Sequence, residues 1–210
     1  MIFGLLLYVV LCLPPVAAGL EGSMLGHMLV QIPLLALAGG LVARAAAGGR
    51  PAALAGCNAG GFPGLLIALF AATVWMLPRM LDAALASPLT EAAKFASVPL
   101  FVGAPLALSW QLLPTVARGF VWANLISQAA VLGWLYSVSP NRLCTRYLLD
   151  QQAALGAALL LVAAIVAIAL GWRAIARASV SRAPGTGTGR RNFLNQHDEE
   201  QGRGSWQSMG

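Results

Sequence analysis

The sequence predicts an all-α fold: a polytopic transmembrane helix bundle of about six membrane-spanning helices, followed by a disordered C-terminal tail. Two observations carry this prediction. Of the 210 residues, 59% are hydrophobic and 10% are charged, and the mean hydropathy of +0.76 lies far above that of soluble domains. The chain also contains six apolar stretches, each near the length of about 20 residues that a bilayer core requires.

The six spans are expected near residues 2–20, 25–46, 60–78, 95–113, 117–138 and 152–172. The first lacks a basic N-terminal region and is followed by no polar mature segment, so it is predicted to be a helix instead of a secretory signal. Prolines inside the spans predict kinks or local openings at Pro33, Pro99 and Pro105. Glycine pairs that predict close helix packing are Gly39–Gly40 and Gly60–Gly61. Tryptophans expected in the interfacial belt are Trp75, Trp110, Trp122, Trp134 and Trp172.

The chain is expected to divide into a transmembrane bundle, 1–177, and a disordered cytoplasmic tail, 178–210, which is rich in Arg, Gly and Ser. Six spans would place both termini on one side of the membrane. That side carries the larger share of basic residues next to span ends, so both termini are predicted to be cytoplasmic. We therefore expect a multi-pass protein of the bacterial inner membrane, whose basic excess faces anionic lipids and not nucleic acid.

Unusual residues gather at the outer, non-cytoplasmic ends of the predicted spans. Helical spacing aligns Met24, His27 and Gln31 on one face, with Met28 beside them, and Met76 and Met80 lie at the end of the third span. Imidazole and thioether groups together suit Cu(I), which predicts a copper site at His27, Met28, Met24, Met76 and Met80. The alternative is ordinary: the methionines fill gaps in the bundle, and the histidine bonds a carbonyl or water.

Other polar residues carry weaker indications. Asp82 and Asp150, at predicted helix boundaries, are typical of helix caps or interfacial carboxylates. With a single histidine in the membrane part, no catalytic triad can be assembled, so we expect no enzyme. Cys12, Cys57 and Cys144 lack the spacing of a disulfide or zinc site, and His197 is expected to be a solvated tail residue.

Three ordered motifs resemble the CtaG family of cytochrome c oxidase assembly factors, polytopic membrane proteins tied to copper insertion into haem-copper oxidases. The motifs run from about Met24 to Trp172 and are GHMLVQIPLLALAG, WMLPRMLDAALASPLTEAAKFAS and LLDQQAALGAAL. Residues that match the family pattern are His27, Met28, Trp75, Pro78, Asp82, Asp150 and Gln151. The resemblance implies a role in assembling the copper centres of an oxidase of the respiratory chain, with oxidase subunits or copper chaperones as partners.

The departures from the family leave two interpretations open. Gln31 and Met76 stand where the family has histidines, Glu91, Lys94 and Phe95 stand near its expected His, Glu and His, and six helices are predicted instead of seven. In one interpretation thioethers replace imidazoles and hold Cu(I) weakly for transfer. In the other the metal site has decayed, since a cation such as Lys94 would repel copper, and a scaffold or accessory subunit remains.

A small solute or ion transporter is a third possible class, in which proline-broken helices together with Asp82, Asp150 and Gln31 would line a path. Its ionisable groups would be expected near the bilayer midplane, whereas the sequence predicts no charge buried within any span.

Overall fold

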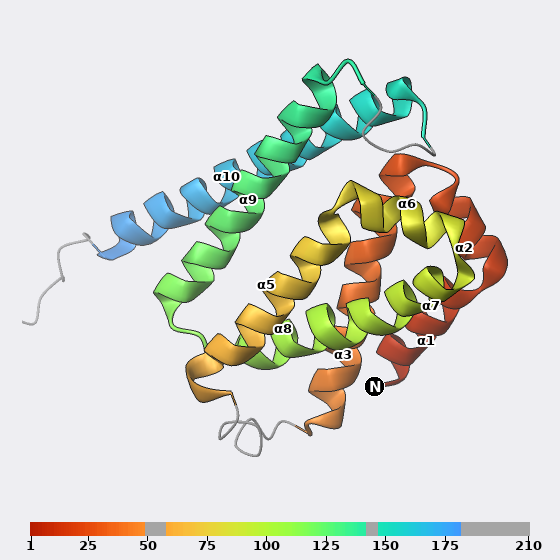
Figure 1. Ribbon diagram of the computed structural model, residues 1–210. Helices are drawn as coiled ribbons and strands as arrows, with labels where there is room; N and C mark the ends of the chain where they lie inside the picture. The colour runs from red at the N-terminus through yellow and green to blue at the C-terminus, as the bar shows by residue number, and fades with distance from the viewer. Residues whose placement is uncertain (49–57, 142–146, 182–210) are drawn as a thin grey trace, which may run out of the picture. The chain divides into compact units, whose positions relative to one another are not determined.

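The computed structural model describes residues 1–48, 58–141 and 147–181, and within these ranges every regular element is a helix (Figure 1). Among the described residues, five helical segments are long and apolar enough to cross a membrane, and a bent pair of helices at the N-terminus makes a sixth if it counts as one span. The predicted class, a polytopic helix bundle, is confirmed. The cysteines Cys57 and Cys144 lie outside the described residues, whereas Cys12 is a free, exposed thiol.

The elements occur in chain order as follows. The N-terminal part contains α1 (Ile2–Cys12), α2 (Pro14–Glu21), the π-helix η1 (Gly26–Gln31) and α3 (Ile32–Ala46). The middle part contains the 3-10 turn η2 (Ala59–Gly61), α5 (Phe62–Met76), α6 (Pro78–Ala86), α7 (Pro88–Ser97), the π-helix η3 (Val98–Gly103) and α8 (Ala104–Ser109). The last part contains α9 (Thr115–Val138) and α10 (Leu149–Ser181).

The first predicted span, 2–20, is two helices and not one. Leu13 adopts an extended conformation with ψ of 127°, and α1 and α2 meet there at an angle of 70°. The ring of Pro14 disfavours the helical conformation for the residue before it, which favours a break at Leu13. The fourth span also differs from its predicted bounds, because it runs from Pro88 to Ser109 and so begins earlier than residue 95.

Two of the described spans contain a π-helical turn that ends two residues before a proline. The N–H of Ile32 donates to the carbonyl of His27, and the N–H of Ala104 donates to that of Pro99, which is the i to i+5 pattern of a π-helix. Pro33 and Pro105 follow one residue later, where the ring lacks an N–H and crowds the carbonyl of the preceding turn. The wider turn relieves that crowding, so the predicted local openings are π-helices.

Glycines allow α3 to approach the η3–α8 segment closely. A Cβ atom on Gly39 would lie 2.3 Å from the carbonyl oxygen of Pro99, and one on Gly103 would lie 2.0 Å from that of Ala36. The predicted role of Gly39–Gly40 in close packing is therefore confirmed. Gly60 and Gly61 have a further role, because their positive φ angles of 61° and 79° form the turn that opens α5.

The main hydrophobic core gathers side chains from nearly every described element. It includes Met24, Met28, Leu35, Trp75, Val98, Tyr136, Tyr147 and Leu155. Trp75 is thus a core residue, 7% exposed, whose indole N–H donates to Ser97 Oγ at 2.8 Å, and not the lipid-facing belt residue that was expected. Trp134 and Trp172, in contrast, are largely exposed on the helix surface.

The chain divides into two compact units, Met1–Ala167 and Ile168–Gly210. All of the residues discussed below belong to the first unit. In the second, the described part is the end of α10, where Ile168, Trp172 and Ile175 are exposed. Helix α10 continues to Ser181, so residues 178–181 are helical and not part of a disordered tail. The remainder of the predicted tail, with His197, lies outside the described residues.

A candidate functional site around a buried lysine

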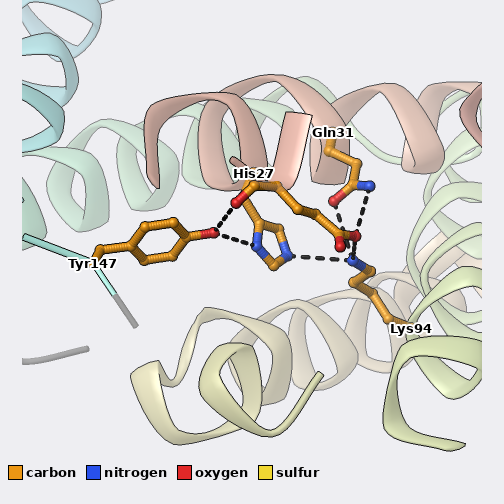
Figure 2. Close-up of polar contacts among 5 residues, drawn as sticks. His27, Gln31, Lys94 and Tyr147 are labelled. Atoms are coloured by element: carbon orange, nitrogen blue, oxygen red, sulfur yellow. Dashed lines mark hydrogen bonds and ion pairs between the residues drawn. The ribbon is translucent and has the colours of Figure 1, made fainter. Parts of the chain in front are cut away.

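A cluster of polar side chains is enclosed among the helices, and Figure 2 shows five residues in mutual contact. The side chains of His27, Gln31 and Lys94 are completely buried, whereas Glu21 keeps 13% of its side chain exposed. Tyr147 is 7% exposed and closes one end of the cluster. Because buried polar groups in a membrane bundle are costly and often functional, this cluster is the candidate functional site.

Three regions far apart in the sequence supply these side chains, the first of which contains both α2 and η1. Glu21 is the last residue of α2, His27 and Gln31 lie on the π-helix η1, Lys94 lies on α7, and Tyr147 precedes α10. The π-helical turn η1 contributes two side chains to the cluster. His27 and Gln31 lie close to one face of this wider turn, and both contact Lys94. At the start of this turn, Ser23 Oγ accepts the N–H of Gly26 at 3.0 Å.

Lys94 lies at the centre of the cluster. Its Nζ is 2.5 Å from Glu21 Oε1, 3.1 Å from Gln31 Oε1 and 3.3 Å from His27 Nε2. A lysine ammonium has three N–H donors, so three protein acceptors use its whole hydrogen-bonding capacity. The ion pair with Glu21 neutralises the charge, which makes burial of this lysine tolerable.

The contacts of Tyr147 assign the protons of the histidine ring. The single hydroxyl proton of Tyr147 is donated to the carbonyl oxygen of Glu21 at 2.8 Å, because a carbonyl can only accept. The hydroxyl oxygen, 3.1 Å from His27 Nδ1, must therefore accept a proton from that nitrogen. Nε2 then carries the lone pair and accepts from the ammonium of Lys94. His27 is a neutral imidazole with both nitrogens engaged.

Gln31 links the acceptors around the ammonium. Its amide oxygen accepts from Lys94, and its amide Nε2 donates to Glu21 Oε1 at 3.0 Å. This pattern fixes the orientation of the amide, because the opposite orientation would place an N–H group against the ammonium. Lys94 Nζ also lies 4.8 Å from the ring centroid of Phe95, a favourable cation–π distance.

The structure brings some of the predicted site residues together and separates others. His27 and Gln31 share one polar cluster (Figure 2). Met24 and Met28 are buried in the main hydrophobic core. Met76, at the end of α5, is half-buried, and Met80, on α6, is 39% exposed. Neither belongs to the core that holds the other two methionines. In the described ranges, no three His, Cys, Asp or Glu side chains are placed to share a metal ion.

The remaining predicted residues lie as follows. Trp75 belongs to the core, and Pro78 is the first residue of α6. Asp82 is half-buried in the middle of α6, so it does not cap that helix. Asp150 is exposed in the first turn of α10, where a carboxylate is favourable. Gln151 is half-buried, whereas its neighbour Gln152 is 2% exposed and donates to the carbonyl of Tyr136 at 3.4 Å.

Sequence reasoning missed Glu21 and Tyr147 and misjudged Lys94. The prediction that no span buries a charge is wrong, because Lys94 is fully buried within the Pro88–Ser109 segment. A signal was present: Lys94 is the sole lysine of the chain and directly precedes an apolar run. Its carboxylate partner, 73 residues away, could not be identified from spacing.

Comparison of the chain with protein-family models, with curated proteins and with solved structures finds no match.

Proposed function

We propose that the chain is a scaffold or accessory subunit that assists assembly of a haem-copper cytochrome c oxidase without holding copper at His27. The resemblance of its three motifs to the CtaG family supports the choice of partner. The geometry of the polar cluster supports the absence of copper. The proposal also places the chain in the bacterial inner membrane with both termini in the cytoplasm, on the basis of its basic residues.

The observation that carries the proposal is the contact between Lys94 Nζ and His27 Nε2, at 3.3 Å. Copper bound by the imidazole would need the lone pair that this ammonium engages. The positive charge beside the nitrogen would also repel a cation. The other ring nitrogen donates its proton to Tyr147 and offers no lone pair. His27 is therefore arranged as a hydrogen-bonding residue of the bundle.

Copper handling by His27 and its methionines is the competing function. It would require Lys94 to leave a fully buried position and the thioethers of Met24 and Met28 to leave the core. Met76 and Met80 are more accessible, but neither belongs to the core that contains Met24 and Met28. The structure thus supports the scaffold more than the copper carrier.

Purification of the tagged chain from its native membranes in mild detergent tests the proposal. We expect a haem-copper oxidase to co-purify, detected by its haem absorption bands, with the natural chain and equally with a His27→Ala, Met28→Ala, Met76→Ala variant. Gel filtration of the variant serves as the control for folding. Absence of the oxidase from both preparations would refute the partnership.

Copper is measured separately on the chain produced alone, so that copper of the oxidase does not interfere. We expect no difference in bound Cu(I) between the natural chain and the triple variant. Copper that is bound by the natural chain and lost in the variant would replace the scaffold with the copper carrier. Solute uptake into proteoliposomes that depends on Asp82 or Asp150 would instead favour a transporter.

A further inference from the structure

We infer that Lys94 is an internal cation that keeps a metal ion out of a set of donor atoms otherwise suited to a divalent metal. The presence of Lys94 would then determine whether this site is filled by an ammonium group or by a metal ion. The inference rests on the part of the proposed function that leaves His27 without metal, and it does not depend on the oxidase.

The donor atoms around the ammonium are of the kinds that bind metals. A carboxylate oxygen of Glu21, an amide oxygen of Gln31 and the unprotonated Nε2 of His27 all point at one position, which Nζ fills (Figure 2). Nitrogen and oxygen donors of this type suit Zn²⁺ and Co²⁺. Metal bonds are about 2.0–2.2 Å long, so two of the donors would have to move inward by about 1 Å.

The orientation of these donors is already fixed by a second set of contacts. His27 donates its Nδ1 proton to the Tyr147 hydroxyl, and Gln31 Nε2 donates to the Glu21 carboxylate. Ligating histidines in metalloproteins hold their second nitrogen in the same way, and ligating carboxylates are likewise hydrogen-bonded. The metal-ligating atoms around Lys94 are thus held in place by hydrogen bonds that do not involve Lys94 itself.

The ammonium of Lys94 and a metal ion cannot be bound at the same time, because each would occupy the position between the three ligand atoms. A metal ion cannot enter while Nζ remains between the three donors. Removal of the Lys94 side chain beyond Cβ leaves the largely buried carboxylate of Glu21 without its counter-charge, and such a site attracts a replacement cation.

The test is a titration of detergent-purified protein with Co²⁺, followed by visible absorption and by thermal unfolding. Lys94→Ala is expected to bind about one Co²⁺ per chain, with a d–d absorption band, displacement by Zn²⁺ and a higher Tm when metal is present. The natural chain is expected to show none of these changes. Methylammonium, which resembles the missing end of the side chain, should compete with Co²⁺ in the variant.

Two further variants identify the donors. Adding His27→Ala to Lys94→Ala should abolish the absorption band, and adding Tyr147→Phe should weaken Co²⁺ binding by about 10–100-fold. A Co²⁺ band in the natural chain, or none in a folded Lys94→Ala protein, would overturn the inference. The outcome is independent of whether an oxidase co-purifies.

If Lys94→Ala does not accumulate in the membrane, Lys94→His provides the second test, since it exchanges the ammonium for a fourth donor. Folded Lys94→His that binds Co²⁺ would support the inference. Failure of both variants to fold with Co²⁺ present would contradict it, because a competent donor set must stabilise the folded state through the metal.

Discussion

Removal of one charge from the buried pair should destabilise the bundle much more than removal of both. In Lys94→Met the side chain keeps its approximate length, but the Glu21 carboxylate loses an ion-pair partner 2.5 Å away, and His27 and Gln31 each lose a donor. Breaking a buried pair on one side costs about 3–5 kcal/mol. For a chain of this size that corresponds to a fall in Tm of about 6–20 °C.

The double variant Lys94→Met, Glu21→Gln distinguishes a charge effect from a packing effect. It removes both charges and leaves an amide in place of the carboxylate, so we expect it to be more stable than Lys94→Met alone. The interaction energy of the double-mutant cycle should be about 2–3 kcal/mol. Thermal unfolding or denaturant titration in detergent micelles measures both quantities.

Arg79→Met is the matched control, because Arg79 is exposed on α6. Its effect on the free energy of unfolding should stay within about 0.5 kcal/mol. The reasoning would be refuted if Lys94→Met were as stable as the natural chain, or if the effects of the two substitutions in the pair simply added.

Three further predictions follow from the packing. Lys94, as the sole lysine, should resist amine-reactive acetylation in the folded protein and react once the protein is denatured, which mass spectrometry of the peptide that contains Lys94 would detect. Rapid labelling of that peptide in the folded state would contradict the burial of Lys94. Tyr147→Phe should lower the free energy of unfolding by about 1–3 kcal/mol, because a buried histidine N–H and a carbonyl both lose their partner, and an unchanged Tm would exclude these bonds. Gly103→Leu should prevent the approach of η3 to α3 and lower the yield of folded protein, whereas Gly119→Leu, where nothing lies within 4 Å, should leave the yield unchanged.

Composition and hydropathy were sufficient to predict the fold class, because the length of an apolar run is set by the thickness of the bilayer. The spacing of His27 and Gln31 also placed them correctly beside one another. Prolines indicated where the second and fourth spans would be irregular. The form of the irregularity, a π-helical turn, depends on how the chain relieves a local clash and is not encoded in the hydrophobic periodicity.

The candidate site was only partly predictable. Glu21 and Lys94 are 73 residues apart, and His27 and Tyr147 are 120 apart, so their contacts exist only after the helices have packed. The methionines illustrate the converse difficulty. Their positions suggested one cluster at the outer ends of the spans, yet Met24 and Met28 face the core while Met80 is exposed on α6. Helical spacing identifies a shared face but not what covers it.

The π-helical turn at Gly26–Gln31 has a consequence for how this chain can tolerate changes in length. A π turn is equivalent to an α-helix that has accommodated one additional residue. Deleting a single residue there would restore regular α-helical winding and leave α3 in its original rotational setting, whereas the same deletion within α5 would turn every later side chain by about 100°. This turn is therefore a point where the gene could lose a codon and still encode a membrane bundle.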